Sequence, residues 1–183
     1  MTTRPRHATG RHALPSLDGP RLRAPRARPE DAAALQACLD GAPGYFELTE
    51  GGPAAPDHAE RLLEDALADP ARRVHLLIPR QARGGSPGGG GLVAGVLDLH
   101  LDHPGAGDAH VGLLLFRESC QGIGYGAETV GALVHALSAA GYRALRASVG
   151  DENPEARVFW EQVGFAEAER LDRGVTVLER VLG

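Results

Sequence analysis

The chain has 183 residues, of which 43% are hydrophobic and 4% aromatic, and a formal net charge of −5 at pH 7. This length suffices for one domain with its own core, and no apolar run approaches the roughly 18 residues of a membrane span. The N-terminus lacks the apolar stretch of a signal peptide and the two cysteines form no disulfide or metal motif, so we expect a soluble, cytoplasmic protein.

The charge is distributed unevenly along the chain. All 19 basic residues are arginine, and seven of them lie within residues 1–28. From residue 29 onward, 12 arginines face 23 acidic residues. We expect residues 1–20 to be a disordered basic tail and residues 21–183 to form a single domain. A nucleic-acid-binding arm is the alternative for the tail, but it lacks interleaved aromatic residues and the acidic body disfavours phosphate contact.

Hydrophobic patterning predicts mixed strands and helices after the tail. Strands are expected at residues 21–28, 73–79, 92–101, 110–116, 143–149, 165–170 and 175–181. Helices are expected at 29–39, 57–67, 126–140 and 154–163. Residues 41–56 read as a loop, 81–91 as a glycine-rich linker forming a mobile hairpin loop, and 102–108 as a loop between antiparallel strands.

The most informative segment is residues 121–126, which read Gln-Gly-Ile-Gly-Tyr-Gly. It lies between the apolar run 110–116 and a helix with apolar residues at i, i+3, i+4 and i+7 from Val130. Glycine lets a backbone approach a ligand closely, and the unpaired N–H groups at a helix start favour an anion. A dinucleotide-binding turn needs another glycine spacing, and a Walker loop needs lysine, which the chain lacks. On these residues alone, a tight turn without a ligand stays open.

A second motif follows at residues 153–165, which read Asn-Pro-Glu-Ala-Arg-Val-Phe-Trp-Glu-Gln-Val-Gly-Phe. The pair Gln-x-x-Gly-x-Gly and Asn-x-x-Ala-x-x-Phe-Trp-x-x-x-Gly-Phe strongly resembles the motifs of the GNAT N-acetyltransferase superfamily. Gln121 takes the Gln/Arg position of the family's first motif, which makes Gly124 and Gly126 its two glycines. The specific resemblance covers about residues 109–165, and a looser one covers residues 21–181.

The resemblance implies an α/β (α+β) fold with a central mixed, mostly antiparallel sheet of about six to seven strands and helices on both faces. It implies acetyl-CoA (coenzyme A) as co-substrate and no metal. The strand near Phe116 would pair with the pantetheine arm, the turn would hold the pyrophosphate, and Asn153 would reach the thiol end, although an Asn before a helix is often only an N-cap. The cofactor-binding residues expected are Leu114, Leu115, Phe116, Gln121, Gly122, Ile123, Gly124, Tyr125, Gly126, Asn153 and Trp160.

The reaction implied by the resemblance is direct transfer of an acetyl group to an amine of a small molecule or peptide, which an acidic body suits weakly. Two positions depart from the family: Ser148 stands where some relatives have Glu, and Trp160 stands where many have a catalytic Tyr. An indole N–H cannot deliver a proton at neutral pH. A non-catalytic acyl-CoA-binding or regulatory protein is therefore the alternative. Nucleic acid and membrane partners are not expected, and a homodimer stays open.

A general base is needed to free the amine of its proton. Asp98, His100 and Asp102 alternate on one face of their strand, and His110 begins the neighbouring strand. A solvent-facing polar side is the expectation for this row, and a metal site is the less favoured alternative.

A further candidate base is Glu47, in a loop that borders the acceptor site in the family. Its neighbours Tyr45 and Phe46 form either a substrate wall or a cap on the core. We expect Glu47, His100 or Asp98 to act as base, directly or through water, with Glu47 slightly preferred. Cys120, before the glycine-rich turn, is expected to be structural because direct transfer needs no thiol nucleophile.

Overall fold

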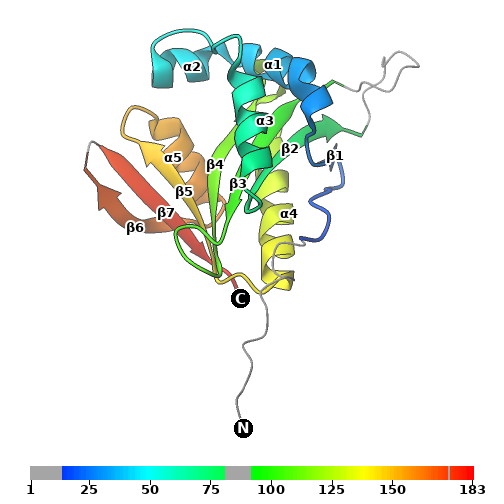
Figure 1. The fold of residues 1–183 in the computed structure, drawn as a ribbon. Coiled ribbons are helices and arrows are strands. Elements are labelled where there is room, and N and C mark those ends of the chain that lie inside the picture. Colours follow the sequence, from blue (N-terminus) through cyan, green and yellow to red (C-terminus); the bar gives the residue numbers. More distant parts are fainter. Residues whose placement is uncertain (1–13, 81–91, 173) are drawn as a thin grey trace.

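The computed structural model describes residues 14–80, 92–172 and 174–183. These residues form a seven-stranded sheet in the order β1-β2-β3-β4-β5-β7-β6, with helices on both faces (Figure 1). β4 and β5 are parallel, and every other neighbouring pair is antiparallel. The expected mixed, mostly antiparallel sheet is confirmed.

The elements follow the predicted order closely. The strands are β1 (Leu22–Arg23), β2 (Arg72–Pro79), β3 (Gly95–Leu101), β4 (Asp108–Phe116), β5 (Ala144–Gly150), β6 (Ala166–Leu171) and β7 (Val175–Val181). The helices are α1 (Ala32–Asp40), α2 (Pro43–Glu50), α3 (His58–Ala68), α4 (Tyr125–Ala139) and α5 (Pro154–Gln162), with short 3-10 turns η1 (Pro29–Asp31) and η2 (Glu118–Cys120).

One face of the sheet is covered by α4 and α5. The apolar stripe of α4 that the sequence predicts is buried, and it packs with Leu97, Leu99 and Leu101 of β3 in one cluster. Trp160 of α5 belongs to the same cluster. Gly141 ends α4 with a φ of 80°, a left-handed conformation that glycine adopts without a steric penalty.

The other face is covered by α1, α2 and α3. Their buried residues pack on Val74 and Leu76 of β2, Val96 of β3 and Leu115 of β4. β3 therefore lies between the two helix layers and is buried along nearly its whole length, although Asp98 and His100 alternate with leucines in its second half.

Two local predictions were wrong. The segment expected to be a loop at 41–56 contains α2, which begins with Pro43 at its first turn and ends before Gly51 at a φ of 74°. The glycines and prolines that suggested a loop are the start and stop signals of this short helix. The first strand is also shorter than expected, since only Leu22–Arg23 is strand and Arg26 forms an isolated bridge with His75.

The residues just before β1 are packed against the domain. Leu17 is buried in the core cluster beneath α4, and the Asp18 carboxylate accepts a hydrogen bond from the Ala24 N–H at 2.8 Å. The expected tail boundary at residue 20 therefore falls inside a packed segment. Residues 1–13 of the expected tail and the expected hairpin loop at 81–91 lie outside the described residues. None of the described helices has the length and hydropathy to cross a membrane.

Candidate functional site

The sheet splits between β4 and β5. The two strands are paired only from Asp108↔Ala144 to Val111↔Ala147, although β4 continues to Phe116 and β5 to Gly150. Figure 1 shows the two strands diverging. Backbone groups of β4 beyond Val111 therefore have no β5 partner in the sheet, which leaves them available to another chain-like molecule.

A cleft of about 760 Å³ lies at this split. Its walls are the end of β4, the glycine-rich turn (residues 121–126) with the start of α4, one side of α5, and α2. Ten of the eleven residues expected at the cofactor line it: Leu114, Leu115, Phe116, Gln121, Gly122, Gly124, Tyr125, Gly126, Asn153 and Trp160. Ile123 does not line the cleft, and its side chain is exposed.

The glycine-rich turn is held in an unusual backbone conformation. Gly122 and Gly124 have φ values of 71° and 87°, a region that costs L-residues energy and glycine nothing. The Gln121 side chain donates a hydrogen bond to the Phe116 carbonyl at 2.8 Å, which ties the turn back to β4. A Cβ at Gly126 would lie 3.0 Å from the Phe159 ring, so glycine also permits close packing of α4 on α5.

Helix α5 forms the opposite wall. Asn153 is its N-cap, and the side-chain oxygen accepts a hydrogen bond from the Ala156 N–H at 3.0 Å. Asn153 therefore both caps α5 and lines the cleft. Trp160 packs edge-on against Phe165 at 4.8 Å between ring centroids and lines the cleft while being buried.

Helix α2 closes the cleft on its third side. Tyr45 and Leu48 line the cleft, whereas Phe46 is fully buried in the core, so the two aromatic residues divide the roles that the sequence left open. The Glu118 carboxylate accepts a hydrogen bond from the Gly44 N–H at 2.9 Å, which joins α2 to the segment after β4. Burial, with the nearby carboxylates of Glu50 and Glu152, raises the pKa of Tyr45, which stays a neutral phenol.

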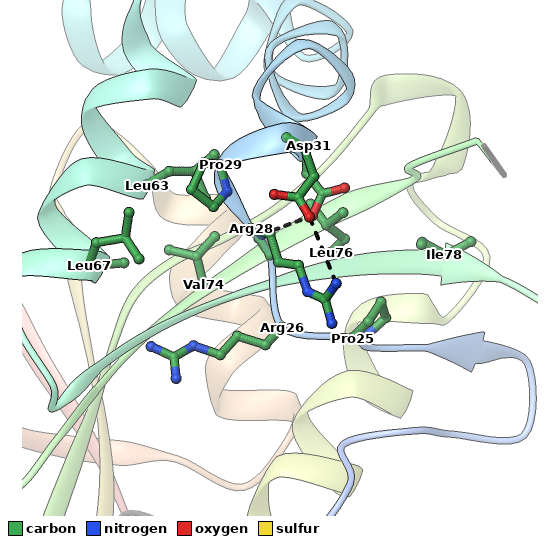
Figure 2. A pocket seen from close by; sticks show the side chains of 13 residues that line it. Pro25, Arg26, Arg28, Pro29, Asp31, Leu63, Leu67, Val74, Leu76 and Ile78 are labelled. Atoms are coloured by element: carbon green, nitrogen blue, oxygen red, sulfur yellow. Dashed lines mark hydrogen bonds and ion pairs between the residues drawn. The ribbon is translucent and has the colours of Figure 1, made fainter. Parts of the chain in front are cut away.

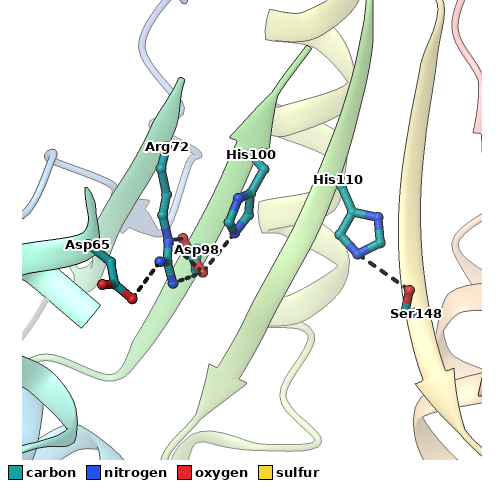
Figure 3. A network of polar contacts seen from close by, with 6 residues as sticks. All are labelled: Asp65, Arg72, Asp98, His100, His110 and Ser148. Atoms are coloured by element: carbon teal, nitrogen blue, oxygen red, sulfur yellow. Dashed lines mark hydrogen bonds and ion pairs between the residues drawn. The ribbon is translucent and has the colours of Figure 1, made fainter. Parts of the chain in front are cut away.

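Polar side chains cross the sheet beside the split, on the face that carries α1–α3 (Figure 3). We call Arg72, Asp98, His100 and His110 the polar row. Arg72 binds Asp98 through two nitrogens, at 3.0 Å and 2.9 Å, and the His100 Nε2 lies 3.3 Å from the same carboxylate. Burial favours a raised pKa for Asp98, but hydrogen bonds from His100 and Arg72 outweigh it and lower the pKa.

The row is not the solvent-facing side that the sequence predicts. Asp98 is only 3% exposed, and Asp102 has left the strand for a turn, where its carboxylate accepts a hydrogen bond from the Gly107 N–H at 2.7 Å. The charge of Asp98 is compatible with burial because Arg72 pairs with it.

His110 joins the row from β4, opposite His100. Its Nε2 lies 3.4 Å from the Ser148 hydroxyl, and its ring stacks edge-on with that of His103 at 5.6 Å between centroids. Burial first, then electrostatic interactions with His103, His100 and Arg146, lowers the pKa of His110 to about 4. His110 is therefore neutral near pH 7. The sequence indicates only that it begins the neighbouring strand, because the clustering depends on register.

Gly112 marks the point where β4 bends. Asp98 pairs with Leu113 and Leu99 with Val111, so Gly112 is an extra residue in β4 with no opposite residue in β3. A Cβ there would lie 2.8 Å from Asp98 Oδ2 and 2.9 Å from His100 Nε2. Glycine is thus required for the Asp98–His100 pair to approach the strand at the split.

Among the expected bases, Asp98 and His100 come together and Glu47 lies apart. Glu47 is exposed on α2, and none of Glu47, Asp98 and His100 lines the cleft itself. Cys38 and Cys120 are both buried and free, and Cys120 lines the cleft. Across the described residues, no group of three or more His, Cys, Asp or Glu side chains could hold a metal ion.

A second cavity of about 640 Å³ lies elsewhere, between residues 25–31, α3 and β2 (Figure 2). Val74, Leu76 and Ile78 form its apolar floor. None of the residues expected at the cofactor lines this second cavity, whereas ten of them line the cleft at the β4–β5 split, which is therefore the candidate site.

Comparison with known proteins agrees with this fold. A family model described as an acetyltransferase (GNAT) domain matches residues 21–166. The chain belongs to the GNAT acetyltransferase family. A search of curated proteins found no match.

Solved structures extend the comparison. An acetyltransferase from Thermus thermophilus is 31% identical, with a TM-score of 0.78, covering 88% of this chain and 97% of that one. The fold is also that of RimL, a ribosomal-protein alpha-N-acetyltransferase in complex with coenzyme A, at 15% identity and a TM-score of 0.69 over 92% and 97% of the two chains. Spermidine N-acetyltransferase from Vibrio cholerae, in complex with coenzyme A and spermine, shares 17% identity and a TM-score of 0.66 over 88% and 95%.

Proposed function

We propose that this protein transfers an acetyl group from acetyl-CoA to an amine of a small molecule or peptide. The observation that carries the proposal is the cleft at the β4–β5 split, which is bounded by unpaired strand backbone on one side and by the amide-rich turn at the start of α4 on the other. Strand backbone suits the amides of a pantetheine arm, and a helix N-terminus suits a diphosphate. Coenzyme A carries both groups in one extended molecule.

In the proposed reaction, the amine nitrogen attacks the thioester carbonyl, the C–S bond breaks, and coenzyme A leaves as a thiolate that takes a proton from solvent. Trp160 stands at the leaving-group position of the family and is not a proton donor. A backbone N–H of β4 beyond Val111 is the proposed donor to the oxyanion, since such a donor is fixed before the reaction.

We propose His100 as the group that receives the amine proton, directly or through water. It lies beside Gly112, where β4 bends at the split, and it is partly open to solvent with a side-chain exposure of 30%. Asp98 is a weak base because its pKa is lowered, so its proposed role is to orient His100. Glu47 remains the alternative base, because Tyr45 and Leu48 of the same helix line the cleft.

Coenzyme A binding is tested by Gly122→Asp. Position 122 lines the cleft and has open space for a side chain, whereas a side chain at Gly124 would meet Arg21. The added carboxylate would repel the diphosphate, so we expect calorimetry to show at least about tenfold weaker binding of coenzyme A. Gly122→Asn, which carries the same backbone strain at a φ of 71° without the negative charge, is the matched control. Equal affinities for the two variants would mean that the site is misplaced.

Turnover is tested by release of free thiol from acetyl-CoA with a broad panel of amines. The rival is a non-catalytic acyl-CoA-binding or regulatory protein, kept open by Ser148 and Trp160. Coenzyme A binding without amine-dependent thiol release across the panel would favour that rival.

The base is tested on an amine that supports turnover. We expect His100→Asn to lower the rate by about 10²–10⁴ while coenzyme A binding is retained. His135→Asn, at an exposed position on α4, is the matched control, and Glu47→Gln tests the alternative base. If His100→Asn and Glu47→Gln both turn over like the wild type, neither residue is the base.

A further inference from the structure

Arg21 lies against the glycine-rich turn and is not among the residues that line the cleft. Its Nη1 donates a hydrogen bond to the Ile123 carbonyl at 2.9 Å, and its Nε donates one to the Glu128 carboxylate at 2.7 Å. The guanidinium carbon also lies 5.0 Å from the centroid of the Tyr125 ring, a cation–π distance. One side chain from the segment before β1 thus contacts three positions around the turn.

The hydrogen bond from Arg21 to the Ile123 carbonyl influences the direction in which the Gly124 N–H points. The Ile123–Gly124 peptide is trans, since the only cis bond among the described residues joins His103 and Pro104. In a trans peptide the carbonyl and the following N–H point in opposite directions. Arg21 is absent from the cleft lining and Gly124 is part of it. When Arg21 holds the Ile123 carbonyl outward, the Gly124 N–H is directed inward.

The second role of Arg21 is its ion pair with Glu128. This carboxylate lies in the first turn of α4, beside the proposed diphosphate position, and it accepts hydrogen bonds from the backbone N–H groups of Arg21 at 2.8 Å and Leu22 at 3.0 Å. Burial favours a raised pKa for Glu128, but the bonds from Arg21 and Leu22 lower it, so the group is ionised near pH 7. An uncompensated negative charge here would repel an anion, and Arg21 compensates it.

We propose that Arg21 is a positioning residue of the coenzyme A site, which orients the Ile123–Gly124 peptide toward the diphosphate and neutralises Glu128. This inference rests on the proposed function. Arg21 contacts no ligand directly and acts through the turn. The segment before β1 therefore belongs functionally to the cofactor site, although it lies about a hundred residues away in sequence.

The test compares coenzyme A with pantetheine, which lacks the diphosphate, by calorimetry on the full chain. We expect Arg21→Ala to weaken coenzyme A binding by about 10-fold or more, as is usual for losing a charge-assisted hydrogen bond. Pantetheine binding should change less than about twofold. Arg21→Lys, which can still pair with Glu128, should recover part of the loss. Arg23→Ala, at an exposed position two residues further along in β1, is the charge-matched control.

A further variant separates the two tasks of Arg21. In a Glu128→Gln background there is no carboxylate for Arg21 to neutralise, so only its bond to the Ile123 carbonyl is left to test. We expect Arg21→Ala to weaken coenzyme A binding in that background too, because the Ile123 carbonyl loses this bond. No loss in that background would overturn the orienting role. Melting curves of all variants show whether the fold is retained, and the two backbone bonds to Glu128 do not depend on the Arg21 side chain.

Three outcomes overturn the inference. Wild-type affinity of Arg21→Ala for coenzyme A would remove it and leave the proposed function standing. An equal loss for coenzyme A and pantetheine would mean that Arg21 only stabilises the fold. A wild-type chain that does not bind coenzyme A would overturn the proposed function and this inference together.

Discussion

Single residues at the β4–β5 split are constrained by close contacts rather than by their own preferences. Gly112 shows this clearly, because a Cβ there would meet both Asp98 and His100 at less than 3 Å. Asp98 is equally constrained, since a nearly buried carboxylate is compatible with folding only while Arg72 pairs with it. The polar row is therefore a set of mutually dependent residues.

His110 in this row makes stability depend on pH. The groups around it are His100, His103 and Asp98 on the β3 side and Arg146 and Ser148 on β5. Its pKa is about 4 in the fold, against an ordinary value of about 6.5 in the unfolded chain. Between these values the unfolded chain binds a proton that the folded chain does not, so stability falls as the pH falls from about 6.5 to 4.

We expect His110→Asn to remove this part of the pH dependence. Urea unfolding at pH 7.5 and pH 5 should show a larger loss of stability for the wild type than for the variant. The exposed His135→Asn should behave like the wild type. If the wild type and His110→Asn lose the same stability over this range, the pKa of His110 is not depressed.

At the scale of elements, α5 shows how one residue serves both fold and site. Its N-cap Asn153 satisfies the Ala156 N–H through one side-chain oxygen, and the same residue lines the cleft. The side-chain NH₂ group is not needed for the cap. A stability measurement and a binding measurement can therefore separate the two roles.

We expect Asn153→Ala to lower the free energy of unfolding by about 1 kcal/mol, the usual cost of losing an N-cap. Asn153→Asp should keep the stability, because a carboxylate caps as well as an amide. If the NH₂ group contacts the cofactor, both variants should bind coenzyme A more weakly in calorimetry. Wild-type affinity for Asn153→Asp would mean that Asn153 is a cap alone.

Helix α2 shows the limit of element prediction from composition. Glycine and proline are typical of loops, yet here they bound a helix of eight residues with one fully buried side chain, Phe46. A helix this short is not stable by itself. Packing of Phe46 on α1 and α3, together with the bond from Gly44 to Glu118, decides that it forms.

On the scale of the whole molecule, the cleft is built by segments distant in sequence. Residues of α2, β4, the glycine-rich turn and α5 meet there, and Arg21 supports the turn from the segment before β1. The meeting point is the end of the parallel β4–β5 pair, because the two strands separate after Val111. A continuous antiparallel sheet would have left no such gap.

Residue types and their spacing were sufficient to predict the family, the order of nearly all elements and most of the residues that line the cleft. This was possible because the turn at 121–126 and the motif at 153–165 act locally: glycines set the backbone, and Asn153 caps the helix that follows it. Such features depend on neighbours in the chain and can be predicted from residue types and their spacing.

Only the tertiary structure decided how the polar residues are paired. Strand register and packing decide the burial of Asp98 against Arg72, the row with His110, the exposure of Glu47 on α2 and the support of the turn by Arg21. The extra residue at Gly112 changes which side chains of β4 share a face. Strand register and bulges set the contacts between residues far apart in the chain. Neither can be predicted from the spacing of residues in the sequence.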